Sequence, residues 1–167
     1  MSEQTPTNWL GDERVQRAIT LIWHEAALLD AKDYLAWQEL YTPEAIYVIP
    51  IDPDTEDFAA SLNMVFDDDR MRRMRVERMM QGFSPSAVAA ARTIRTVSNF
   101  RPTSVTDDEV TLKANQTVVA YKRNRFQTNA GEVTFTIALG GDGDRIATKV
   151  IRLLNSEDAV TASGYLL

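Results

Sequence analysis

The feature that most restricts the fold of this 167-residue chain is an alternation of apolar and polar residues in its second half. Apolar residues from Val110 to Ala120 alternate with polar ones, and a second alternating run covers residues 133–139. A period of two residues predicts strands with one buried face. Further strands are expected over residues 93–101 and 146–154. Turn signals at 129–131 and 140–144 are expected to separate these strands.

The first half of the chain predicts helices. Asp12 is the expected N-cap of an amphipathic helix that runs to about Ala31. Its apolar stripe is Val15, Ala18, Ile19, Ile22, Trp23, Ala26 and Leu29. A short second helix is expected over residues 34–40, and Thr42-Pro43 should end it. Residues 45–49 are apolar throughout, which predicts a well-buried strand.

The middle of the chain is more irregular. Residues 51–60 are acidic and predict a loop, and residues 61–66 predict a short strand. Three aspartates, Asp67–Asp69, place negative charge at the start of a helix that should run to about Met80. Gly82, Pro85 and the neighbouring serines predict a break after it.

Helices first and hairpin-linked strands afterwards indicate an α+β fold. Long antiparallel strands of this kind curl, and the helices would fill the concave face of a cone that offers an apolar cavity. We expect one domain over residues 1–167, with residues 1–10 flexible. The polar N-terminus has no signal-peptide core, and no apolar run approaches a membrane span. A soluble cytoplasmic protein is therefore expected, and a net charge of −6 argues against nucleic-acid binding.

The residues that could carry chemistry are few. The chain has no cysteine and one histidine, which excludes thiolate nucleophiles, Cys-ligated zinc and Cys-bound iron–sulfur clusters within it. His24 lies at the flank of the first helix without a partner at coordinating spacing, so we interpret it as a surface or interface residue. Glu25 and Asp30 could each be a buried general base. The simpler interpretation is that such residues pair with an arginine or cap a helix, and that Asp30 caps the second helix.

The densest charge cluster combines Asp67–Asp69 with five arginines between Arg70 and Arg78. An anion or nucleic-acid site is one interpretation. The adjacent aspartates neutralise much of the positive field, and Glu77 lies within reach of Arg73 at four-residue spacing. A helix surface or subunit contact is therefore favoured. The acidic loop 52–57 lacks the glycine of a calcium loop.

Four motifs together resemble the small (beta) subunits of Rieske-type aromatic-ring-hydroxylating dioxygenases. Residues 23–30 (WHEAALLD) with Tyr34 and Trp37 are similar to the family's "EA-LLD---Y--W" opening. Segments 68–79, 92–99 and 149–155 resemble its "DDR…RV-RL", "SRT-R-VSN" and "KVV-L" motifs in the same order. The stretch 84–92 departs from the family's "DPPSRT" because it is longer and alanine-rich, which affects the local loop.

The resemblance implies the cystatin-like cone shared with nuclear transport factor 2, scytalone dehydratase and ketosteroid isomerase. It implies a partner alpha subunit that holds a Rieske 2Fe-2S cluster and a mononuclear non-haem iron, with three small subunits forming a trimeric base. It assigns no catalytic, cofactor or metal residue to this chain. As candidate subunit-interface residues we select Arg70, Arg75, Arg78, Arg92, Arg95 and Asn99.

Two alternatives use the same cone. A stand-alone dehydratase or isomerase would need an acid and a base in an apolar pocket, such as a carboxylate facing Tyr34, Tyr47 or Tyr121. A non-catalytic ligand-binding module would need only the cavity.

Overall fold

The computed structural model describes residues 8–81, 91–158 and 166–167. It contains one sheet of six strands in the order β2-β1-β6-β5-β4-β3. The elements are η1 (Trp9–Gly11), α1 (Glu13–Asp30), α2 (Tyr34–Gln38), β1 (Tyr41–Pro50), β2 (Asn63–Asp67), α3 (Asp69–Gln81), β3 (Arg92–Val105), β4 (Glu109–Lys122), β5 (Arg125–Ala138) and β6 (Arg145–Leu153).

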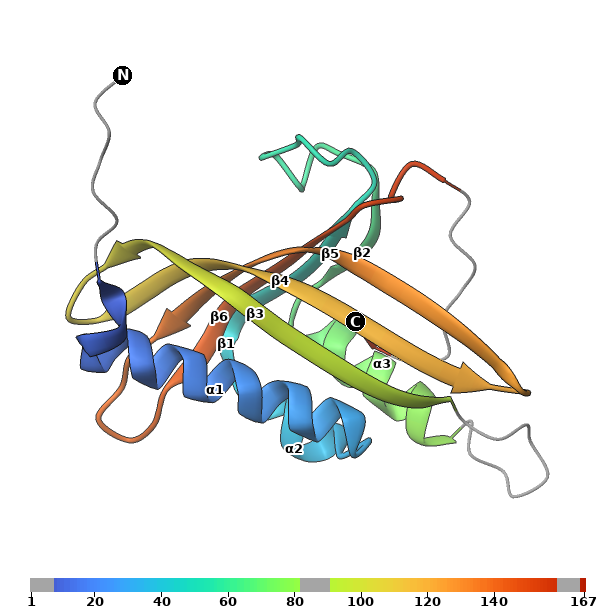
Figure 1. Cartoon of the computed structure of the whole chain (residues 1–167), viewed down its shortest axis with the longest axis horizontal. Helices are drawn as coiled ribbons and strands as arrows, with labels where there is room; N and C mark the ends of the chain where they lie inside the picture. The colour runs from blue at the N-terminus through green and yellow to red at the C-terminus, as the bar shows by residue number, and fades with distance from the viewer. Residues whose placement is uncertain (1–7, 82–90, 159–165) are drawn as a thin grey trace.

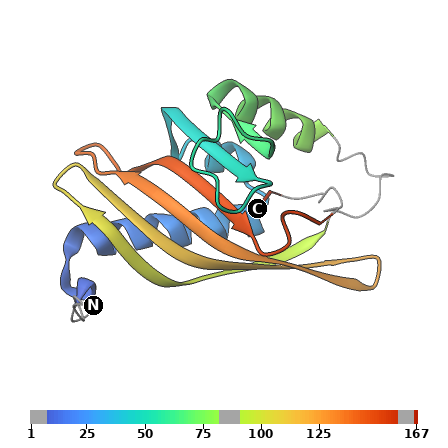
Figure 2. The ribbon, with the colours of Figure 1, turned by 90° about the horizontal axis from the view of Figure 1, so that it is seen from above.

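The sheet is mixed and mostly antiparallel, and its long strands pair in the antiparallel way that the sequence predicts. Only the β1–β6 pairing among the described strands is parallel. Strands β3, β4 and β5 are each 14 residues long, and the twist of such strands curls the sheet. Figure 1 shows α1 lying along one face of this curl, and Figure 2 shows the same helix running beneath the long strands. The predicted α+β cone is confirmed.

Helix α1 begins as the sequence predicts, with the Asp12 side chain accepting a hydrogen bond from the Arg14 amide at 2.9 Å. Its buried stripe differs from the expected one at one position. Trp23 is 56% exposed, and its indole nitrogen donates to the Val97 carbonyl of β3 at 3.0 Å. Glu25 is buried in the stripe instead. The helix therefore turns a carboxylate toward the core, which periodicity alone did not show.

One predicted turn is wrong. Residues 129–131 lie inside β5, and the β4–β5 hairpin turns at Arg123-Asn124, whose φ angles are +52° and +61°. Two consecutive positive φ values are typical of the tight hairpin turns that match strand twist. Gly131 has a different role, because a Cβ atom there would lie 2.3 Å from the Arg152 carbonyl oxygen. The glycine permits close approach of β6.

The strand after α2 begins earlier than expected, at Tyr41, so Pro43 lies within β1 rather than closing the helix. The β1–β6 register shifts between Tyr41 and Ile46, and a proline is tolerated at such an irregularity. The predicted break at 82–86 lies outside the described residues. So do residues 1–7 of the segment expected to be flexible, whereas Trp9–Gly11 form a short 3-10 helix.

Candidate functional site: a closed polar interior and an arginine-rich surface

A buried polar cluster joins α1 to the sheet. Glu25 Oε1 accepts hydrogen bonds from Trp37 Nε1 at 3.0 Å, Tyr41 Oη at 3.0 Å and Lys149 Nζ at 2.8 Å. The Glu25 residue is 1% exposed and Lys149 is fully buried. The expected partner of Glu25 was an arginine or a helix end, and the observed partner is a lysine of β6. The cluster therefore ties the first helix to the far end of the chain.

The pKa shifts and hydrogen bonds of this cluster indicate a structural role rather than a catalytic one. Burial lowers the pKa of Lys149, and the adjacent Glu25 carboxylate opposes that change. Burial and the Glu25 charge raise the pKa of Tyr41 well above its usual value, so its hydroxyl remains a donor. A carboxylate does face a tyrosine here, as an isomerase would need. However, three donors already occupy one oxygen of Glu25, so this carboxylate is an ion-pair partner and not a ready base.

Asp30 forms a second link between α1 and the sheet. It accepts hydrogen bonds from Thr93 Oγ1 at 3.0 Å and from the Arg95 amide at 2.9 Å, and it forms an ion pair with the Arg95 guanidinium. The expectation that Asp30 caps the second helix is wrong, because Asp33 caps α2 through the Ala36 amide. Asp30 lies at the last position of α1, where β3 passes close enough to supply donors.

The charge cluster around α3 is more buried than the sequence indicates. Asp67 is held by a bidentate ion pair with Arg75, at 2.6 and 3.0 Å. Arg72 is buried, donates to the Ala45 carbonyl, and stacks over the Tyr41 ring at 4.7 Å. These arginines attach α3 to β1 and β2. The remaining charges of the helix face outward.

Those outward charges pair differently from the expectation. Arg73 pairs with Asp69 at 3.0 Å rather than with Glu77. The Asp68 side chain accepts from the Met71 amide at 2.9 Å, so the aspartate run does begin the helix as predicted.

The six candidate interface residues fall into two groups. Arg70, Arg78, Arg92 and Asn99 are exposed. Arg75 and Arg95 point inward onto Asp67 and Asp30. Asn99 has a φ of +56° beside a register shift in β3, so it stands at a kink of the edge strand. The assignment of all six to an interface stays a prediction.

His24 is exposed on α1 in a shallow depression that Arg17, Thr20 and Asp144 also line. Arg17 is committed to an ion pair with Asp144. The interpretation of His24 as a surface residue agrees with this position. In the described ranges 8–81, 91–158 and 166–167, no group of three or more His, Cys, Asp or Glu could hold a metal ion.

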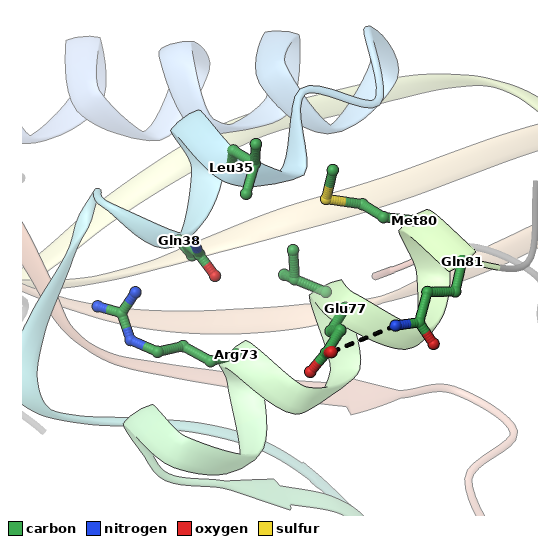
Figure 3. Close-up of a pocket in the computed structure, with 7 residues that line it drawn as sticks. Leu35, Gln38, Arg73, Glu77, Met80 and Gln81 are labelled. Atoms are coloured by element: carbon green, nitrogen blue, oxygen red, sulfur yellow. Dashed lines mark hydrogen bonds between the residues drawn. The ribbon is translucent and has the colours of Figure 1, made fainter.

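A groove lies between α2 and α3 (Figure 3). Leu35 of α2 and Met80 of α3 project toward one another across it, and Val76 lines it as well. Three of its polar side chains are already engaged, because Glu77 accepts from Gln81 at 3.2 Å and Arg73 pairs with Asp69. Apolar walls with mostly engaged polar groups suit packing against another surface better than chemistry. Within the described segments, no helix is long and apolar enough to cross a membrane.

The fold of this chain is that of a known class of cone-shaped α+β proteins. An NTF2-like protein with a cystatin-like fold from Novosphingobium aromaticivorans superposes with a TM-score of 0.60 at 16% identity, covering 88% of this chain and 86% of that one. The beta subunit of benzoate 1,2-dioxygenase from Burkholderia mallei superposes with a TM-score of 0.75 at 22% identity, covering 89% and 95%. At these identities the likeness establishes the fold.

Sequence comparison identifies the family within that class. Residues 24–157 match the family model described as ring hydroxylating beta subunit. The chain is 26% identical over 142 residues to the 2-halobenzoate 1,2-dioxygenase small subunit of Burkholderia cepacia, covering 82% of this chain and 86% of that one. It is 23% identical over 146 residues to benzoate 1,2-dioxygenase subunit beta of Acinetobacter baylyi, covering 84% and 86%.

The chain belongs to the family of ring-hydroxylating beta subunits, because the match covers most of its length. The resemblance drawn from its motifs is thereby confirmed. A dioxygenase subunit is supported over a stand-alone dehydratase or isomerase.

Proposed function

We propose that this chain is the structural small subunit of an aromatic-ring-hydroxylating dioxygenase that adds O2 to an aromatic ring during aromatic compound catabolism. The observation that carries the proposal is the family match over residues 24–157. The chemistry would be performed by a partner alpha subunit. We place the assembly in the cytoplasm, without nucleic acid or membrane as a partner.

The donor atoms of the chain support a non-catalytic role. A Rieske cluster takes two cysteines and two histidines, and a mononuclear non-haem iron takes two histidines and a carboxylate. This sequence has no cysteine and one histidine, so it cannot complete either set. Both iron centres are therefore assigned to the alpha subunit. Glu25, a buried acid of the core, is held in an ion pair with Lys149.

The contacts of the small subunit would be made by its outer surface. We propose that it self-associates as a trimer and that Arg70, Arg78, Arg92 and Asn99 contact other subunits directly. Arg75 would act indirectly, because it holds the start of α3 in place through Asp67. Arg95 would likewise hold the edge strand β3 against α1. Arginine suits such contacts because its planar fork forms bidentate pairs.

The test is co-expression with the alpha subunit encoded by the same source, followed by size-exclusion chromatography with light scattering. The expected mass is that of three large and three small chains. The small subunit alone should have the mass of a trimer and no oxygenase activity. Failure to form any complex with the alpha subunit would contradict the proposal.

The interface residues are tested in the same assay by Arg70→Ala, Arg78→Ala and Arg92→Ala. Each should shift the elution toward smaller species while leaving the circular dichroism spectrum unchanged. The matched control is Arg125→Ala, an exposed arginine outside the candidate set. If the control and the three variants behave alike, these arginines are not the contact residues.

A further inference from the structure

The interior of the cone holds a short piece of the chain that no strand or helix contains. Leu166 and Leu167 are 5% and 6% exposed, and both belong to the hydrophobic core. Figures 1 and 2 both place the C mark of the chain inside the outline of the sheet and helices, not at its periphery. The two residues are therefore enclosed by the fold.

Side chains from three strands hold the main chain of this dipeptide. Arg95 of β3 donates to the Leu166 carbonyl oxygen. Lys149 of β6 donates to the Leu167 oxygen at 3.0 Å. Tyr47 of β1 donates to the same oxygen at 2.9 Å and accepts from the Leu167 amide at 3.2 Å. The dipeptide thus receives donors at both oxygens and an acceptor at its amide.

This arrangement differs from ordinary chain packing. Strands β1 and β3 are separated by three others in the sheet, so the dipeptide bridges two distant parts of the concave face. Its described polar partners are all side chains, which is how a bound peptide is recognised when it adds no strand. In addition, Arg95 is 8% exposed and its buried Nε has no hydrogen-bond partner within the described part of the chain. The site therefore contains one N–H donor, Arg95 Nε, that the dipeptide does not use.

Two of the three donors are also held in place without the dipeptide. Lys149 is positioned by Glu25, and Arg95 is positioned by Asp30 and Thr93. A site whose polar groups are fixed by other residues needs little ordering when a ligand enters, which favours binding. Removing the dipeptide would therefore leave a preorganised apolar pocket with a few convergent polar groups, the usual form of a small-molecule site.

We propose that the interior of the cone is a ligand-binding site, which in this structure is occupied by the chain's own residues Leu166–Leu167. Its ligand class is a short apolar acyl-peptide, in which branched apolar groups stand next to carbonyl or carboxylate oxygens. Tyr47, Arg95 and Lys149 bind those oxygens. The proposal does not rest on the assembly, because Tyr47, Arg95 and Lys149 all bind the dipeptide within a single chain.

The test uses the 167-residue chain, the chain lacking residues 166–167, and N-acetyl-leucyl-leucine as the probe. The deletion should lower the melting temperature by ~10 °C, because two buried leucines and their hydrogen bonds are lost. Isothermal titration should show one probe bound per shortened chain, with recovery of part of the lost melting temperature. The intact chain should bind at least tenfold more weakly, since its site is filled.

Two variants keep the test decisive. If the shortened chain does not fold, the full-length double variant Leu166→Ser, Leu167→Ser replaces it, with Leu154→Ser at an exposed leucine as the control. Tyr47→Phe in either background should weaken probe binding about fivefold to tenfold, because one donor and acceptor is lost. Absence of probe binding, or equal binding by intact and altered chains, would overturn the proposal.

Discussion

The buried pair of Glu25 and Lys149 makes the sharpest prediction about stability. Their charged atoms lie 2.8 Å apart, and both side chains are essentially inaccessible. At an effective dielectric constant of about 20, charges at that separation attract by roughly 6 kcal/mol. Desolvation of each ion costs several kcal/mol, so the pair contributes little net stability while each partner depends strongly on the other.

The perturbation is a double-mutant cycle with Glu25→Gln and Lys149→Met. Each single variant leaves an uncompensated buried charge and should lower the free energy of unfolding by about 3–5 kcal/mol. The glutamine keeps an oxygen that can accept from Trp37 and Tyr41, so the double variant should lose only about 1–2 kcal/mol. The expected coupling energy is therefore at least ~3 kcal/mol.

The assay is urea unfolding at pH 7 and fixed protomer concentration, followed by circular dichroism with a check that the m-value is unchanged. The matched control is Lys113→Met. Lys113 and Glu132 also form an ion pair, at 2.9 Å, but their side chains are 44% and 36% exposed. That surface pair should contribute at most about 1 kcal/mol. The reasoning is refuted if the Lys149 variant resembles the control, or if the double variant loses the sum of the singles.

Three further predictions concern Tyr41, Gly131 and Asp30. Because the pKa of Tyr41 is raised in the folded protein, this tyrosine ionises at a lower pH in the unfolded chain. Its contribution to the free energy of unfolding is therefore complete below pH ~10 and is lost as the pH rises above that value. Tyr41→Phe should flatten the decline by roughly 1.4 kcal/mol per pH unit in unfolding measured from pH 9 to 11. Gly131→Ala should destabilise by roughly 2–3 kcal/mol in thermal unfolding, since the new Cβ meets the Arg152 carbonyl oxygen at 2.3 Å; a neutral effect would contradict the close approach of the strands. Asp30→Ala should cost about 3 kcal/mol in urea unfolding, because Arg95 stays buried without its carboxylate, and a loss below 1 kcal/mol would show that the link is dispensable.

Much of the fold could be predicted because it depends on local periodicity. The stripe of α1, the cap at Asp12 and the alternation in β4 each reflect how one element meets the core, and neighbouring residues carry that information. The turn at 129–131 was misassigned because Gly131 signals either a turn or a close backbone approach. The actual turn, at Arg123-Asn124, has only a weak signal, an asparagine that tolerates positive φ.

The interior could not be predicted in the same way. Glu25 and Lys149 are 124 residues apart, and no spacing rule links them. The Lys149 position reads only as part of a buried strand, and a lysine there is expected to face solvent. A sharper signal existed at Glu25, a carboxylate within the apolar stripe of α1, because a buried charge requires a partner somewhere in the fold.

By itself, the sequence determined the order of helices and strands, the cone and the family, because periodicity and short motifs encode how each element packs and which relatives share it. It also showed that this chain has no cysteine and only one histidine, since residues can be counted without coordinates. Only the tertiary structure decided which charges are buried together, where Asp30 and Arg95 meet, and that Leu166–Leu167 fills the interior. Those features depend on side chains brought together across long sequence separations, and pairing of this kind leaves no local pattern.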